Sequence, residues 1–324
     1  MWVSIKNVLL AAGLAFAVLA SADGAFAQAQ QPAAANDQLL LQQMQGQVAG
    51  RVSIPDAKSG LLIQPQGREW RELREGPVKT VGGAIIIAIV LALCAFFLVR
   101  GRIRIDAGPS SKRITRFNGV ERFAHWLTAV SFIVLGLTGL NLVFGRALLL
   151  PLIGPEAFTA LTQVGKLAHN YLSFAFVLGI VMMLVLWLQH NIPNRLDIEW
   201  LKQGGGLLKK GVHPPSGKFN GGQKLIFWAV VLGGAAVSVT GYILMFPFYF
   251  TDMAGMQLSQ VIHAVVALVL IAVIIAHIYI GSIGMEGAFD AMGTGDVDLN
   301  WAKEHHSLWV EELTGKKASH AGDD

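Results

Sequence analysis

Long apolar stretches separated by polar connections dominate the pattern of this 324-residue chain. Five of them contain no Asp, Glu, Lys or Arg: residues 81–99, 125–144, 170–190, 225–246 and 261–283. About 20 apolar residues in a helix are enough to cross the hydrocarbon core of a bilayer. The pattern therefore predicts an all-α membrane protein with five transmembrane helices.

The start of the chain carries a shorter apolar run with the marks of a secretory signal peptide. Lys6 precedes the apolar residues 8–20, and a small-x-small sequence, Ala-Phe-Ala, ends at Ala27. This order of a basic residue, an apolar run and a cleavage site is typical of a signal peptide. We expect removal after Ala27, with an uncleaved sixth span as the alternative.

The amino-acid composition agrees with a membrane protein and limits the cofactors that the chain can hold. The chain is 53% hydrophobic and only 14% charged, whereas soluble proteins are about 25% charged. Its net charge of +4 does not indicate a nucleic-acid partner, because most basic residues lie in loops beside the spans. Cys94 is the only cysteine, so the chain cannot by itself hold an iron–sulfur cluster or a c-type haem.

The distribution of Lys and Arg predicts the orientation in a bacterial inner membrane. Seven basic residues lie between the first and second spans and six between the third and fourth. Only two lie between the second and third, and none in residues 247–260. Basic loops stay in the cytoplasm. We therefore expect a multi-pass protein with a periplasmic N-terminal segment and a cytoplasmic C-terminal tail.

Four histidines fit this topology in depth. His263 and His277 are fourteen residues apart in the last span, which places them roughly 40° apart around the helix and about 21 Å apart along it. His125 opens the second span on the cytoplasmic side, and His169 opens the third on the outer side. Depth alone predicts an outer pair, His169 with His263, and an inner pair, His125 with His277.

Histidine pairs on different helices suit the axial positions of haem iron. The pattern therefore suggests two haems stacked across the membrane and a path for electrons. A histidine-lined ion transporter is the alternative from another class. Transporters usually also carry intramembrane carboxylates or broken helices, and these spans contain no Asp or Glu.

Four segments carry a resemblance to a known family. They are RFNGVERFAHW at 116–126, HNIPN at 190–194, KFNGGQK at 218–224 and WAKEHH at 301–306. Together they resemble the cytochrome b, or gamma, subunit of respiratory formate dehydrogenase over roughly 112–312. The E-R-x-x-H-W start is shared with other membrane cytochromes b, including those of hydrogenases.

The resemblance implies a four-helix membrane domain that holds two b-type haems. Its ligand pattern carries over to His125 and His277 for the cytoplasmic-side haem, and to His169 and His263 for the outer haem. These are the pairs that depth predicts. The resemblance implies that the haem iron, bound by these four histidines, is the chain's metal.

The family also places a quinone site beside the inner haem, near its N-x-G-Q segment. That implies quinone-site roles for Asn220, Gly222 and Gln223. The alternative for these residues is a turn before the fourth span, since Asn-Gly is a common turn dipeptide.

The implied function is electron transfer within a formate dehydrogenase complex. An alpha subunit with a molybdenum or tungsten cofactor would oxidise formate, and an iron–sulfur beta subunit would pass electrons to this chain. Two haem b groups would then carry them to quinone, so the chain would not itself hold the formate-oxidising site. The alternatives are the cytochrome b subunit of a membrane-bound nickel–iron hydrogenase and the ion transporter.

These inferences divide the chain into five parts. They are a signal peptide at 1–27, a periplasmic segment at 28–78, an extra transmembrane helix at 79–105, the di-haem domain at 106–285 and a cytoplasmic tail at 286–324. Shorter members of the family lack the first 105 residues.

Two further expectations concern the rest of the sequence. No internal repeat is evident. We expect His190 to be interfacial and the remaining histidines to be solvated in cytoplasmic loop or tail: His213, His305, His306 and His320.

Overall fold

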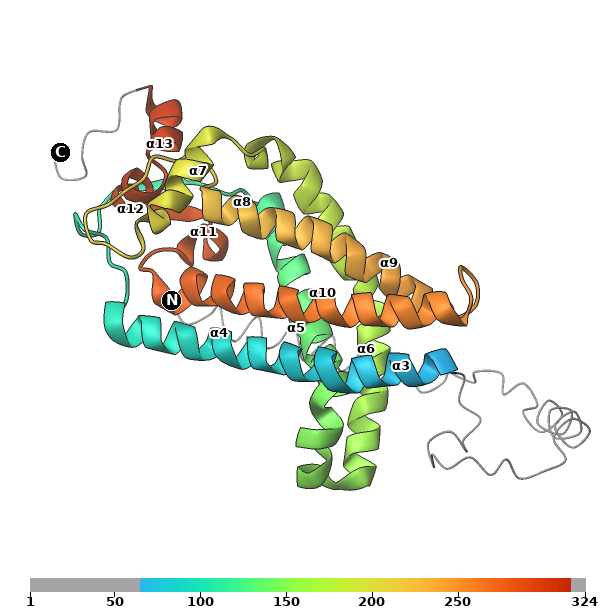
Figure 1. Cartoon of the computed structure of the whole chain (residues 1–324). Helices are drawn as coiled ribbons and strands as arrows, with labels where there is room; N and C mark the ends of the chain where they lie inside the picture. The colour runs from blue at the N-terminus through green and yellow to red at the C-terminus, as the bar shows by residue number, and fades with distance from the viewer. Residues whose placement is uncertain (1–64, 316–324) are drawn as a thin grey trace, which may run out of the picture. The chain divides into compact units, whose positions relative to one another are not determined.

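The computed structural model describes residues 65–315, and helices dominate that range (Figure 1). Its first helical segment consists of α3 (Pro65–Leu73), the π-helical turn η1 (Arg74–Val78) and α4 (Lys79–Arg100). The helix thus begins before the expected segment 79–105. The wide turn contains Pro77, which has no N–H to donate. α4 ends where Gly101 adopts a φ of 70°.

A helical hairpin follows. α5 (Gly119–Leu148) and α6 (Leu150–Trp187) pack along one another, and the 3-10 turn η2 (Leu188–Asn191) extends α6. Close packing depends on small residues. A Cβ on Gly179 of α6 would collide with the Thr128 hydroxyl of α5.

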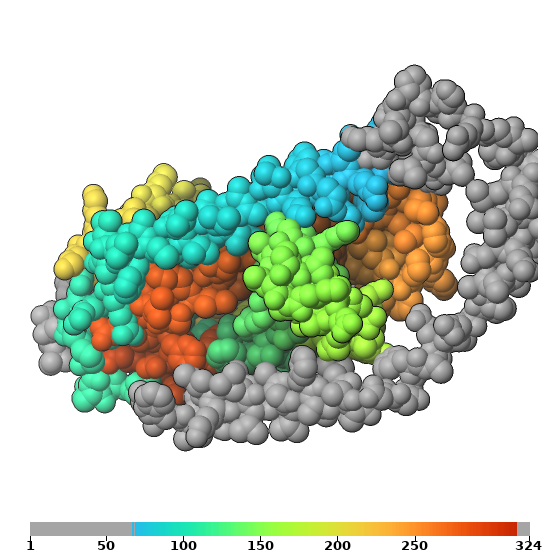
Figure 2. Space-filling model, turned by 90° about the horizontal axis from the view of Figure 1, so that it is seen from below, coloured from blue at the N-terminus to red at the C-terminus, as the bar shows by residue number. Residues whose placement is uncertain are grey.

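The last two spans form a second hairpin. The fourth consists of α8 (Gly221–Trp228), the π-helical turn η4 (Ala229–Gly233) and α9 (Gly234–Met245). The fifth consists of α10 (Met253–Tyr279) and the π-helical turn η5 (Ile280–Gly284). α10 packs against α9 on one side and α4 on another (Figures 1 and 2).

Five helices of the described residues are long and apolar enough to cross a membrane. They are Glu69–Arg100, Gly119–Leu148, Leu150–Asn191, Gly221–Met245 and Met253–Gly284. The predicted all-α membrane fold with one helix before a four-helix domain is therefore confirmed. The signal peptide lies outside the described residues.

Polar segments gather at one end of the spans, and we call them the polar cap. Its strands β1 (Arg113–Thr115) and β2 (Asp296–Asp298) pair antiparallel, with Arg113 opposite Asp298. Its short helices are α7 (Arg195–Lys202), η3 (Gly204–Gly206), α11 (Asp290–Gly293), α12 (Leu299–His305) and α13 (Ser307–Thr314). α7 and α11–α13 lie near the start of α8 (Figure 1).

His306 corrects one expectation, because it is buried in the polar cap and not solvated. Its ring lies between Trp301 and Trp309, and Nδ1 bonds the Gly217 carbonyl at 2.8 Å. His305 packs on Trp301 and is part-buried. Indole rings from α12 and α13 thus cover a histidine that the sequence alone suggested was exposed. His320 lies outside the described residues.

α5 and the span α8–α9 share a local similarity at a single spacing, which we call the repeat. Asn118 and Asn220, 102 residues apart, begin α5 and α8 with the same capping box, closed by Glu121 and Gln223. The same spacing relates Phe117 to Phe219, Trp126 to Trp228, and the dipeptide Thr138-Gly139 to Thr240-Gly241. The apolar residues between these positions differ, and they hide the repeat from a reading of hydropathy.

Candidate cofactor site

Four histidines from three helices form two pairs of rings. His125 of α5 and His277 of α10 have ring centroids 6.2 Å apart and an interplanar angle of 60°. His169 of α6 and His263 of α10 have centroids 6.1 Å apart at 57°. These are the pairs that the depth argument predicts. The two pairs share nearly the same geometry, although they differ in the helices that supply them.

Hydroxyl groups hold both rings of the outer pair. Thr138 Oγ1 lies 2.9 Å from His169 Nδ1, and Thr240 Oγ1 lies 3.1 Å from His263 Nδ1. The other ring nitrogen, Nε2, is left available in each case. Both threonines belong to the repeated Thr-Gly dipeptide, so each half of the repeat supplies one contact.

The inner pair has a different environment. His125 Nδ1 is buried and has no hydrogen-bond partner among the described residues. Its neighbour Trp126 donates from Nε1 to the Met292 carbonyl at 2.8 Å, which ties the start of α5 to the polar cap. The His125 ring lies edge-on to the Trp126 indole.

The donor set limits what these pairs can bind. Within the described residues, no group of three or more His, Cys, Asp or Glu side chains is placed to hold a bare metal ion. Two imidazoles per pair suit instead a metal that brings its other ligands with it. Haem iron is such a metal, because the porphyrin supplies four nitrogens and the protein the axial positions.

The other candidate residues lie where α8 begins. The Asn220 side-chain oxygen accepts from the Gln223 amide, and Gln223 Oε1 accepts from the Asn220 amide and from Arg116. A Cβ on Gly222 would lie 2.8 Å from the Trp200 ring. All three thus have structural roles in a helix start, as the turn alternative holds.

The capping box at the start of α8 does not use every polar group of its two residues. Its hydrogen bonds involve only the side-chain oxygens of Asn220 and Gln223. Among the described residues, none accepts a hydrogen bond from either side-chain NH2 group. Each NH2 is therefore a donor available to a ligand carbonyl.

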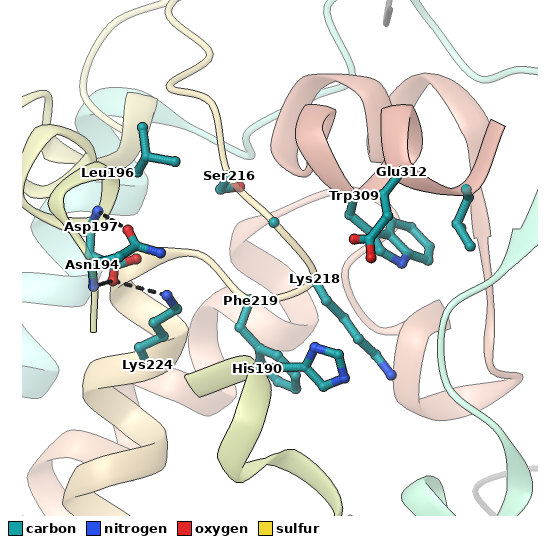
Figure 3. A pocket seen from close by; sticks show the side chains of 12 residues that line it. His190, Asn194, Leu196, Asp197, Ser216, Lys218, Phe219, Lys224, Trp309 and Glu312 are labelled. Carbon is teal, nitrogen blue, oxygen red and sulfur yellow. Dashed lines mark hydrogen bonds and ion pairs between the residues drawn. The ribbon is translucent and has the colours of Figure 1, made fainter. Parts of the chain in front are cut away.

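A cavity of about 520 Å³ opens beside this helix start (Figure 3). Residues of α7, α13 and the segment before α8 line it. Among its polar residues are His190, Asp197, Lys218, Lys224 and Glu312. Lys224 pairs with Asp197 at 2.9 Å, and Lys218 pairs at 2.7 Å with Glu121 of α5. Charged groups therefore connect the cavity with the first turn of the helix that carries His125.

A membrane helix bundle with two pairs of part-buried histidines defines the class: a membrane cytochrome b. The family model described as prokaryotic cytochrome b561 matches residues 116–295, and the chain belongs to this family. The family is one of membrane electron-transfer cytochromes and carries b-type haem.

Relatives with curated names make the comparison more specific. The chain is 31% identical over 219 residues to the cytochrome b556(Fdn) subunit of the nitrate-inducible formate dehydrogenase of Escherichia coli (strain K12), covering 65% of this chain and 98% of that protein. It is 30% identical over 211 residues to the cytochrome b556(fdo) subunit of formate dehydrogenase from the same strain, covering 63% and 97%. The formate dehydrogenase cytochrome b556 subunit of Haemophilus influenzae is 29% identical over 206 residues, covering 62% and 83%.

These relatives favour the electron-transfer interpretation over the transporter and the hydrogenase subunit. Several residues around the site are not predicted by the sequence pattern. They are Thr138, Thr240 and the ion pair of Glu121 with Lys218. The repeated Thr-Gly dipeptide, at the same spacing as the two helix caps, was the signal that could have found the threonines.

Proposed function

We propose that this chain is the cytochrome b subunit of a formate dehydrogenase complex. It carries electrons from an iron–sulfur subunit through two b-type haems to quinone. The names of the curated relatives support the complex. The observation that carries the proposal is the pair of nearly equal histidine separations, 6.2 and 6.1 Å.

These separations fit two imidazoles on one metal. Two imidazoles that bind one metal through nitrogen, at about 2 Å each, would have ring centroids roughly 6 Å apart. The separations of both pairs agree with this value. In this proposal His125 and His277 bind the inner haem, and His169 and His263 bind the outer haem.

The haems supply the one-electron chemistry, and the chain sets their order. His263 and His277 belong to one helix, so their spacing of about 21 Å fixes the depth of both sites along α10. The outer pair would hold the group that receives electrons and the inner pair the group that passes them on, so negative charge would move toward the polar cap.

We place the quinone beside the inner pair, at Asn220, Gly222 and Gln223. The amide NH2 groups of Asn220 and Gln223 are suitable donors to a quinone carbonyl. Gly222, which has no side chain, lets the start of α8 pack closely against the Trp200 ring. Reduction of a quinone also takes up protons, and the neighbouring cavity offers titratable groups on that side, including His190 and Lys218.

The proposed orientation makes this reaction conserve energy. The chain lies in the bacterial inner membrane, with residues 28–78 periplasmic and the tail from 286 cytoplasmic, as the basic loops indicate. Formate is oxidised in a partner subunit with molybdenum or tungsten, outside the membrane. Electron entry outside and proton uptake inside then move charge across the membrane.

Separate replacement of the two α10 histidines tests the proposal in the assembled complex. We expect His277→Ala to lose one haem and to abolish quinone reduction, while formate oxidation with an artificial dye continues. His263→Ala should lose the other haem. His213→Ala, which changes a histidine paired with Asp106 in the polar cap, is the matched control and should keep both haems. Normal quinone reduction in the His277 variant would overturn the assignment.

A further inference from the structure

Each histidine of the outer pair is held by a hydrogen bond to a threonine, and each half of the repeat supplies one such threonine. We propose that Thr138 and Thr240 are positioning residues, each fixing the tautomer of one outer histidine so that both Nε2 atoms face the shared metal. This inference rests on the proposed haem ligation. It concerns how the outer site is set, and it can fail while the ligation stands.

The direction of each hydrogen bond follows from the threonine's other contact. Thr138 Oγ1 also donates to the Val134 carbonyl at 2.7 Å, and Thr240 Oγ1 to the Ala236 carbonyl at 2.7 Å. A hydroxyl has one proton, so toward the ring each oxygen acts as acceptor. With this assignment the imidazole nitrogen Nδ1 carries the hydrogen, and the backbone carbonyls of Leu135 and Val237 also accept from the rings of His169 and His263.

The tautomer decides which nitrogen can bind metal. A neutral imidazole has one N–H and one lone pair, and the hydrogen bond of one nitrogen sets the role of the other. With Nδ1–H bound to Thr138 or Thr240, Nε2 keeps the lone pair. Both outer histidines are thus prepared in the form that an axial ligand needs.

Glycines beside the threonines bring the rings close. A Cβ on Gly139 would lie 3.7 Å from His169 Cε1, and a Cβ on Gly241 would lie 3.2 Å from His263 Cε1. Each Thr-Gly dipeptide therefore contacts its histidine through the threonine hydroxyl and places a residue without a side chain beside the ring. The second contact is tight enough that a side chain at 241 would press on the ring.

The repeat explains why threonine hydroxyls contact the outer histidine pair and not the inner pair. The spacing that relates Thr138 to Thr240 relates His125 to Phe227, which cannot bind metal. The repeat therefore does not supply a second histidine equivalent to His125. His125 Nδ1 also has no hydrogen-bond partner among the described residues. The two sites differ in the support of their ligands.

This difference affects the redox potentials. Donation from Nδ1–H to an acceptor makes an imidazole a more basic ligand. A more basic ligand favours the oxidised iron, so the hydroxyls lower the potential of the outer haem. A lower outer potential favours electron transfer from the outer to the inner site, which is the direction of the proposed function.

The test is a redox titration of variants in purified holoprotein, followed by optical and EPR spectra. Thr138→Val and Thr240→Val keep the side-chain shape and remove the hydroxyl acceptor, while the Leu135 and Val237 carbonyls stay in place. Each variant should raise the outer-haem potential, by similar amounts. Thr138→Ser and Thr240→Ser restore the hydroxyl and should restore the potential. The haem that disappears in His263→Ala identifies the outer signal.

Thr128→Val is the matched control. Thr128 is also a buried threonine of α5 that donates to its own helix, to Ala124 at 2.9 Å, but it faces Gly179 of α6. It should leave both potentials unchanged.

Two results decide the matter. A raised outer-haem potential in the Val variants would support the positioning role. Loss of the outer haem in the Val variants, with the haem kept in the Ser variants, would support it equally. Val variants with wild-type haem content, potentials and EPR spectra would overturn it. If His169→Ala also kept both haems, the proposed function itself would fail, so the two failures are distinguishable.

Discussion

Glu121 shows how single polar side chains organise the inner end of the bundle. Its carboxylate accepts from Trp187 Nε1 at 2.9 Å, from Lys218 Nζ at 2.7 Å and from the Asn118 amide at 2.9 Å. The residue is buried, with 6% of its surface exposed. One carboxylate therefore joins α5, the end of α6 and the segment that precedes α8.

Removal of the Lys218 charge should be costly for this reason. In Lys218→Met the Glu121 carboxylate stays buried without its cation, and breaking a buried ion pair costs about 3 kcal/mol. We expect a corresponding loss in the free energy of unfolding, measured by circular dichroism during denaturant titration in detergent. Lys210→Met, at an exposed position, is the control and should be neutral. Equal stability of both variants would contradict a structural role for the pair.

At this scale the sequence predicted part of the candidate site. The rise of a helix and the count of basic residues are enough to place four histidines in two pairs by depth. The threonine contacts were not predictable in that way, because they depend on how α5 and α9 are rotated toward their neighbours. Hydropathy does not determine that rotation in nearly uniform apolar helices. His306 was missed for a similar reason, since only tertiary contact with Trp301 and Trp309 buries it.

Helix caps are the elements that the repeat preserves most clearly. The cap at Asn220 needs only a side-chain oxygen, whereas the proposed quinone site needs the NH2 group as well. We expect Asn220→Asp to keep the cap and to impair quinone reduction, and Asn220→Ala to lose about 1 kcal/mol of stability in addition. Steady-state quinone reduction and thermal unfolding separate the two effects. Full activity of the Asp variant would restrict Asn220 to capping.

The packing of α12 and α13 in the polar cap should depend on pH. Burial lowers the pKa of His305 to about 4 and the pKa of His306 well below the usual 6.5, and the charge of Arg116 acts in the same direction. These histidines are neutral when packed but bind protons when exposed. Their contribution to stability is therefore present above pH 6.5 and declines as the pH falls toward 4.

Hydrogen–deuterium exchange of peptides from 299–314 measures this effect. After correction for intrinsic rates, protection should fall between pH 7 and 5. A double variant, His305→Phe with His306→Asn, carries no titrating ring there and should show a flatter profile. The Asn side chain can still donate to the Gly217 carbonyl. Unchanged protection of the natural chain at pH 5 would contradict the buried neutral state.

Prediction of elements succeeded for the spans and failed for the polar cap. Spans follow from composition alone, because the bilayer requires long apolar helices, and all five were predicted. The polar cap is built from three-residue strands and helices of eight residues or fewer, which have almost no periodicity to detect. The early start at α3 was also missed, since its residues are polar and Pro77 follows in η1.

Across the whole molecule, the outer histidine pair follows the repeat and the inner pair does not. Two hairpins, α5 with α6 and α8–α9 with α10, each supply one histidine and one Thr-Gly contact to the outer pair. The inner pair takes its histidines from α5 and α10 only. α4 packs on the outside of α10 and adds no histidine, which agrees with a bracing role (Figure 2).

The central claim is that this chain holds two haems, one for each histidine pair. The direct measurement is the amount of b-type haem per polypeptide, by pyridine haemochrome assay on the full chain purified from membranes supplied with haem. The account predicts two haems per chain. One haem in a folded preparation would contradict one of the two pairs, and none would contradict both.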